Sequence, residues 1–248
     1  MTNPNVRVGG LTFFGGAGSD GFYIKDGGLT GLFGGVGVRS DSIPRPQAHG
    51  DYDVPVFRSS RMVSIMGPCE ADSEERLDFY DRQFTGLLAD GQSGRVVFDM
   101  PGGPRWGDAR LAANEFEPVL WGRRADYMLQ LRFANPRLFG EARTFAEGVP
   151  AFHFGNFPAA PVLTVTSASA GGYTISGPSG KQFIVTAPLV SGHPHTIDMA
   201  TGLLEVDGVV VFGGVSRADT WAVPAGAQGT MTVSGTAVLS ALVTDTYI

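Results

Sequence analysis

The chain has 248 residues, of which 43% are hydrophobic and 17% are charged, and this balance excludes a disordered chain. Its formal net charge of −6 argues against a specific nucleic-acid partner, because nucleic-acid binders usually carry a basic face. The single cysteine, Cys69, excludes an internal disulfide. No segment has the length of a membrane span and the first residues do not read as a signal peptide, so we expect no membrane partner and synthesis in a cytoplasm.

Glycine and proline are abundant, with 36 and 16 residues. Both are unfavourable inside helices and both mark turns, so the composition predicts a mainly β protein with little helix. Glycines are densest in residues 1–40, between short apolar clusters such as Leu11–Phe14 and Phe22–Ile24. Such short strands are costly to order, and we expect them to need a partner surface, for example a neighbouring subunit.

One helix is predicted near residues 73–89. Asp72 is the expected N-cap, with Glu75 in capping-box spacing. The apolar residues recur on one helical face, and they are Leu77, Tyr80, Phe84, Leu87 and Leu88. Asp90-Gly91 is expected to end the segment.

Strands are predicted on both sides of this helix. Arg61–Met66 reads as a strand ended by Gly67-Pro68, and Arg95–Met100 is followed by the turn Pro101–Pro104. Tyr127–Phe133 alternates apolar and polar residues, which is typical of a strand with one buried face. Residues 1–140 are therefore predicted to form an α+β domain dominated by a sheet, and residues 141–157 a linker.

Residues 158–248 contain no credible helix. Strands of about eight residues alternate with turn signals here, as in a β-sandwich. Asp207-Gly208 lies between two apolar runs and predicts a tight hairpin. The strand candidates include Val162–Thr166, Trp221–Val223 and Ala237–Thr244.

Sequence patterns that carry chemistry are weak. Gly16–Gly21 matches G-x-G-x-x-G, but no helix is predicted after it to hold a phosphate. His193 and His195, with Asp198 nearby, could hold a metal, although turn histidines are the commoner reading. Glu115 and Glu117 share one strand face, whereas a glycosidase needs carboxylates across a cleft. We therefore assign no catalytic, cofactor-binding or metal-binding residues and expect no enzyme.

Several aromatic residues could form a platform for sugar stacking. In the second half these are Trp221, Tyr173 and Phe183, which we name as candidate contacts to a glycan or a protein partner. Trp106 and Trp121 belong to the first half. Core packing is the usual role of such residues, because aromatic rings bury the largest apolar area.

The order of these segments resembles the distal tail proteins of siphophages. The resemblance rests on Gly27–Leu29, Arg45–Gly50, Arg61–Gly67, Asn135–Gly140, Pro158–Val162, Ile197–Gly202, Val206–Gly208 and Pro224–Gly226. The segment Asn135–Gly140 is similar to one in tail proteins of actinobacterial phages. The likeness covers nearly the whole chain, although its motifs are mostly turns and strand ends, and the glycine-rich residues 9–37 depart from it.

The resemblance implies a structural virion protein of a long non-contractile tail. Its N-terminal, or belt, domain would form a homohexameric hub ring around a channel that the genome passes through, and its C-terminal galectin-like or jelly-roll sandwich would project outward. The implied partners are the tail tube protein, a tail-associated baseplate hub protein and a receptor-binding protein, with assembly in the host bacterial cytoplasm. The alternative is a carbohydrate-binding sandwich that contacts host-surface glycan.

Overall fold

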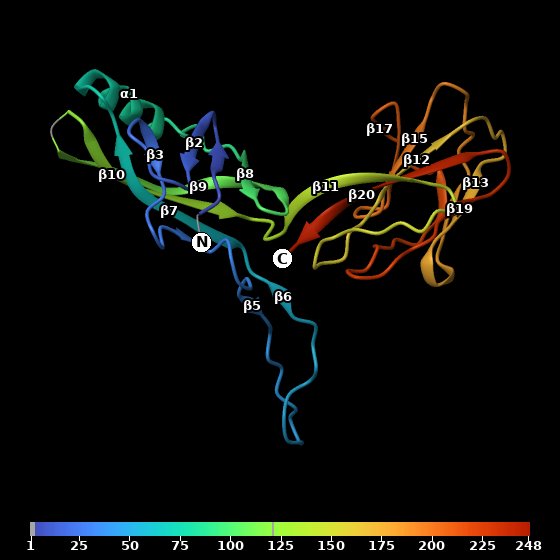
Figure 1. The fold of residues 1–248 in the computed structure, drawn as a ribbon. Helices are drawn as coiled ribbons and strands as arrows, with labels where there is room; N and C mark the ends of the chain where they lie inside the picture. The colour runs from blue at the N-terminus through green and yellow to red at the C-terminus, as the bar shows by residue number, and fades with distance from the viewer. Residues whose placement is uncertain (1–2, 121) are drawn as a thin grey trace. The chain divides into compact units, whose positions relative to one another are not determined.

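A computed structural model of the chain describes residues 3–120 and 122–248. The chain divides into two compact units, one that reaches Leu138 and one that comprises Phe139–Tyr247, with the terminal Ile248 assigned to the first. Both are rich in strands, as the composition predicts, and the one α-helix of the described residues belongs to the first unit (Figure 1).

The first unit is a closed β-barrel. Its main strands are β1 (Val6–Val8), β2 (Leu11–Phe14), β3 (Gly21–Tyr23), β4 (Leu29–Thr30), β7 (Arg61–Glu70), β8 (Gly94–Met100), β9 (Gly103–Leu120) and β10 (Arg124–Phe133). They follow the order β10-β7-β3-β2-β1-β8-β9, and β10 also pairs with β9. Because the last strand of this order pairs with the first, the barrel has no free edge along that path.

The glycine-rich strands find their partners inside the same chain. β1 pairs with both β2 and β8, β2 pairs in parallel with β3, and β4 pairs with β7. The expectation that these strands wait for a neighbouring subunit is therefore wrong for the strands themselves. Apolar side chains of these short strands, among them Val6, Phe13 and Phe22, are buried in the barrel core.

The strand that begins at Arg61 is longer than the sequence predicts. β7 continues through Gly67-Pro68 to Glu70, and its register places Pro68 opposite Asp126 of β10. On its other side β4 pairs up to Ile65 and β3 pairs from Cys69 onward, so Pro68 lies between two ladders. A Cβ on Gly67 would lie 1.9 Å from the Tyr23 carbonyl oxygen, which explains the glycine.

Helix α1 (Glu74–Thr85) buries Leu77, Tyr80 and Phe84 of the predicted apolar stripe. It ends earlier than predicted, with Gly86 as its C-cap, so Leu87 and Leu88 lie beyond the helix. The expected N-cap is displaced by one residue. Ser73 caps the helix, and its side-chain oxygen accepts a hydrogen bond of 3.3 Å from the Arg76 amide. Phe84 contacts a group of barrel rings, which are Phe13, Phe22, Phe116 and Tyr127.

The second unit is a two-sheet sandwich. Its elements are β11 (Leu138–Ala146), β12 (Val162–Thr166), β13 (Tyr173–Ser176), η1 (Pro178–Gly180), β14 (Gln182–Val185), β15 (His195–Asp198), β16 (Leu203–Val206), β17 (Val209–Val210), β18 (Val215–Ala218), β19 (Thr232–Val233) and β20 (Val238–Tyr247). One layer runs β11-β20-β12-β15-β16-β17 and the other runs β18-β14-β13-β19. Residues from both layers, among them Leu163, Ile175 and Phe183, form one buried core cluster.

Two local predictions in this half need correction. Residues 141–157 were expected to be a linker, but they continue β11 to Ala146 and contribute Ala151 and His153 to the interior of the second unit. The predicted strand Trp221–Val223 forms only an isolated bridge between Val223 and Ala159. The Asp207-Gly208 turn joins β16 to β17 as predicted, with positive φ at both residues.

The aromatic group around Phe84 gives a stability test. Replacing Phe84 by alanine should lower the free energy of unfolding by roughly 3–5 kcal/mol, because a fully buried ring is lost and a cavity remains. Phe79, on the same helix but 40% exposed, is the matched control, and Phe79→Ala should change the unfolding free energy much less. Urea titration followed by circular dichroism measures both. Equal losses in the two variants would contradict this packing.

Candidate docking surfaces

Residues 38–58 form an arm, a two-stranded ribbon that joins β4 to β7. Its paired strands are β5 (Val38–Arg39) and β6 (Phe57–Arg58), with Val38 opposite Arg58 and Arg39 opposite Phe57. Figure 1 shows the arm extending away from the barrel of the first unit. Its far end is closed by a turn in which the Arg45 amide donates to the Gly50 carbonyl at 3.2 Å.

The arm exposes more large apolar side chains than a solvated loop needs. Their exposed fractions are Val56 60%, Phe57 60%, Val38 56%, Tyr52 53% and Ile43 49%. A two-stranded ribbon is at best marginally stable alone in water, and a concentration of exposed apolar residues marks an interaction surface. The arm therefore has the properties of a segment that a partner covers.

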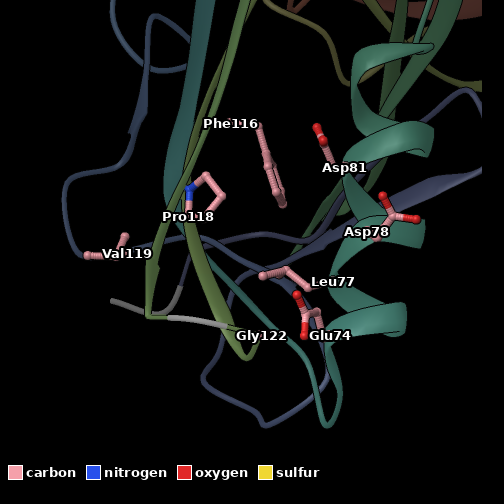
Figure 2. Close-up of a pocket in the computed structure, with 8 residues that line it drawn as sticks. All are labelled: Glu74, Leu77, Asp78, Asp81, Phe116, Pro118, Val119 and Gly122. Atoms are coloured by element: carbon pink, nitrogen blue, oxygen red, sulfur yellow. The ribbon is translucent and has the colours of Figure 1, made fainter.

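A second surface feature lies between α1 and the end of β9. It is a cavity of about 490 Å³ lined by Glu74, Leu77, Asp78, Asp81, Phe116, Pro118, Val119 and Gly122, and we call it the acidic groove. Figure 2 shows Phe116 and Leu77 between the helix and the strands, with the three carboxylates along the helix. The groove thus has an apolar floor and one acidic wall.

The carboxylates of the groove all belong to one wall. Of the three, Asp78 forms an ion pair with Arg82 at 2.8 Å. Glu115 and Glu117, which the sequence placed together, do not line the groove, because they alternate with Phe116 along β9. Two carboxylates facing each other across a cleft, as glycosidases use, are not the arrangement found here.

The G-x-G-x-x-G segment, Gly16–Gly21, forms the loop after β2 and ends at Gly21, the first residue of strand β3, so no helix follows it directly. Asp20 attaches this loop to the helix: its carboxylate accepts hydrogen bonds from the Tyr80 hydroxyl at 2.8 Å and from Arg76 Nη2 at 3.1 Å. The hydrogen bond with Arg76, followed by that with Tyr80, lowers the pKa of Asp20. The segment is therefore a structural tether and not a nucleotide loop.

The two histidines considered as metal ligands make separate contacts with different partners. His195 is buried and its Nδ1 lies 3.0 Å from the Tyr173 hydroxyl, whereas the exposed His193 pairs with Asp207 at 2.6 Å. Asp198 accepts a hydrogen bond from the Ala200 amide in a turn. Among residues 3–120 and 122–248, no group of three or more potential metal ligands is present.

The aromatic residues named as candidate glycan contacts are buried. Trp221 is 5% exposed, Tyr173 4% and Phe183 0%, and all three belong to the core of the second unit. Their prediction as surface contacts is wrong because the sandwich uses these rings to fill the space between its sheets. Trp106 stacks under the Arg95 guanidinium at 3.8 Å, and Trp121 lies outside the described residues.

Sequence reasoning missed both docking surfaces. The arm contains Pro44, Pro46 and Pro55, which indicated a loop, and the period-2 signal there is too short to predict a ribbon. The groove depends on Phe116 and Pro118, which lie more than thirty residues from the helix in sequence. A signal was present in Asp78 and Asp81, which flank the apolar stripe of α1.

In the part of the chain that is described, no helix is long and apolar enough to span a membrane.

The combination of a closed barrel with one helix and a two-sheet sandwich is similar to the solved structure of a phage hub protein. The Dit protein of phage SPP1, described as a paradigm of the hub adsorption apparatus in phages that infect Gram-positive bacteria, matches with a TM-score of 0.77. The match covers 98% of this chain and 99% of that chain at 11% sequence identity. The chain therefore has the fold of this distal tail protein over its whole length.

Two chains from the baseplate of phage P2, solved in its activated conformation with Ca and with Sr, are also similar. Their TM-scores are 0.46 and 0.47, at 9% and 8% identity, and they cover 83% and 86% of this chain and 87% and 88% of their own. No family model and no curated protein matches the sequence.

The buried pair of Tyr173 and His195 predicts a pH dependence. Burial lowers the pKa of His195, while a backbone hydrogen bond with Pro188 opposes this effect. In the unfolded chain the histidine has a pKa of about 6.5 and binds a proton more readily than in the folded protein. The contribution of His195 to the free energy of unfolding should therefore be fully present above that pH, and it should be lost as the pH falls towards the pKa of the folded state.

Unfolding of the full chain measured between pH 7.5 and 5 should show this loss. His195→Gln, which cannot titrate, should reduce the pH slope, and His193→Gln is the control for an exposed histidine. A slope that is unchanged in His195→Gln would contradict the assignment. A titration of the His195 ring followed by NMR reports the same pKa directly.

Proposed function

We propose that this protein is a structural hub of a long non-contractile phage tail. The observation that carries the proposal is the agreement of fold with the SPP1 Dit protein over 98% of the chain, which includes both the barrel and the sandwich. Fold alone does not imply function, so the proposal also rests on the docking surfaces. An exposed apolar arm and a groove are features of a protein that works in an assembly.

In this proposal the barrel units assemble into a homohexameric ring at the distal end of the tail. The ring joins the tail tube protein on one side to a tail-associated baseplate hub protein on the other, and leaves a channel for the genome. The sandwich units anchor a receptor-binding protein. The protein is assembled in the cytoplasm of the host bacterium, and the likeness of Asn135–Gly140 to actinobacterial phage proteins supports such a host.

The properties of the surfaces agree with a structural and not an enzymatic role. The carboxylates that line the groove share one wall, and the conspicuous buried polar pair, Tyr173 with His195, lies inside the sandwich core. A sugar platform built from Trp221, Tyr173 and Phe183 would require the core to open. The glycan-binding alternative therefore lacks a specific supporting observation.

The ring can be tested on the purified full-length chain. Light scattering over a range of concentrations should show a species of six subunits, since closed cyclic symmetry satisfies every copy of an interface. Negative-stain images of that species should show a ring with an open centre. A strict monomer at every concentration, both alone and mixed with its tail tube protein, would contradict the proposal.

A further inference from the structure

The sandwich layer that contains β12 has an outward side that no α-helix of the described second unit covers. Because successive strand residues point to opposite sides of a sheet, the residues between the buried ones face outward. The registers of β20, β12, β15, β16 and β17 align them in rows, and we call this surface the sandwich face. Its rows are Ser240, Thr164, Thr196, Glu205 and Val210, then Leu242, Val162, Asp198 and Leu203, then Val238 and Thr166.

The sandwich face carries few charges. Only Asp198 and Glu205 are charged, and the Asp198 carboxylate already accepts a hydrogen bond of 2.8 Å within its own turn. On β20 and β12 every outward residue of these rows is aliphatic or carries a hydroxyl. Three large apolar side chains are exposed, with fractions of 57% for Val238, 41% for Leu203 and 40% for Leu242. A sheet side that faces water normally alternates to polar residues, so this composition indicates a contact surface.

The barrel shows how a solvated sheet of the same chain is composed. The outward residues of β10 include Arg124, Asp126 and Arg132, all of them exposed, and Glu117 of β9 lies opposite Asp126. The barrel side is thus densely charged, whereas β12 and β20 present no charge in the rows of the sandwich face. The low charge of the sandwich face is therefore a local feature and not a consequence of the overall composition.

A second copy of this chain fits the sandwich face. The net charge of −6 makes two copies repel each other over most of their surfaces. The sandwich face is a place where two copies can approach with few like charges brought together. Its central row also complements itself, since the hydroxyls of Ser240, Thr164 and Thr196 can both donate and accept hydrogen bonds.

We propose that two copies of this chain pair through their sandwich faces, sheet against sheet, with the two-fold axis running along β12 near Thr164. The same residues meet from both copies, so the contact is isologous. This axis places β15 of one copy over β20 of the other and β16 over β11, because β15 and β20 flank β12 in the sheet. Glu205 therefore does not meet Glu205 of the second copy.

The size of the sandwich face determines the strength of the pair. Its rows contain fewer residues than the roughly 20–30 on each side of a standard protein interface. We therefore expect a weak pair between isolated chains, which becomes stronger when several copies are held in one assembly. A two-fold contact joins copies in pairs and cannot close a ring, so the inference goes beyond the proposed hub ring.

Cross-linking gives the direct test. Thr164→Cys, treated with a short bis-maleimide at about 0.5 mM protein, should give a covalent dimer and nothing larger in denaturing gels. The natural Cys69 is a silent background, because it is buried and burial raises the pKa of its thiol to about 12. Phe212→Cys, at a position 87% exposed outside the sandwich face, is the control for random collision. Equal dimer yields from the two variants, or no dimer from Thr164→Cys, would overturn the inference.

Added charge gives an independent test. Leu242→Lys should raise the concentration at half-association by about tenfold, measured by sedimentation equilibrium, because two ammonium groups must then be desolvated in the contact. Phe212→Lys adds the same charge to the sandwich outside this face, and it should associate as the wild type does. Both variants lower the net negative charge equally, so a difference between them reports the face itself. Equal association of the two variants would contradict the pairing.

These outcomes separate the inference from the proposed function. A six-subunit ring in which Thr164→Cys gives no covalent dimer would overturn the paired sandwich faces and leave the hub proposal intact. A chain that gives the Thr164→Cys dimer but forms no ring, alone or with the tail tube protein, would do the reverse.

Discussion

The double pairing of β10 is the constraint on which the first unit depends. β10 pairs along its length with β7 on one side and with β9 on the other, and this second pairing turns an open sheet into a barrel. Closure removes the free strand edges that would otherwise invite further pairing. Closure therefore leaves side chains and projecting segments such as the arm, and not free strand edges, as the surfaces with which the barrel can contact another chain.

Closure also determines where the arm and the acidic groove lie. β7 must run the full height of the barrel to pair with β10 from Arg61 to Glu70. The arm enters at one end of this strand and α1 leaves at the other, so the barrel separates them by its own height. The aromatic group around Phe84 holds α1 to the barrel, and Asp20 ties the neighbouring loop to the same helix. The rigid barrel and helix thus present a preformed groove.

The sequence predicted those parts of the fold whose signals are local. The stripe from Leu77 to Phe84 repeats at helical spacing, and Asp207-Gly208 has the residues that a tight hairpin demands, so both predictions are confirmed. The end of β7 was predicted wrongly because Gly67-Pro68 is a turn signal in isolation. Only the tertiary position of Pro68, between the ladders of β4 and β3, makes a proline acceptable in this long strand.

Whether the candidate site residues can contact a ligand depends on their burial, which the sequence does not reveal. Trp221, Tyr173 and Phe183 have the composition of a stacking platform, yet each ring fills the core of the sandwich. A Cβ on Gly177 would lie 2.7 Å from the Trp221 ring, so the backbone itself is shaped around that side chain. Phe57 shows the converse, since an aromatic residue beside Pro55 in a loop-like segment is exposed and belongs to the arm. The pairing of distant strands determines which aromatic side chains are exposed and can contact a partner.

The second unit buries a carboxylate of its sandwich together with two hydrogen-bond donors. Asp245, with a side chain only 5% exposed, accepts hydrogen bonds at its Oδ1 atom from Arg143 at 2.7 Å and from the Phe154 amide at 2.8 Å. A buried carboxylate without these donors would be costly, so Arg143 and the following loop are ordered together. β11 supplies Arg143 and β20 supplies Asp245, and the segment expected to be a linker is in this way held to the sheet. An ordered segment there gives the sandwich a defined start.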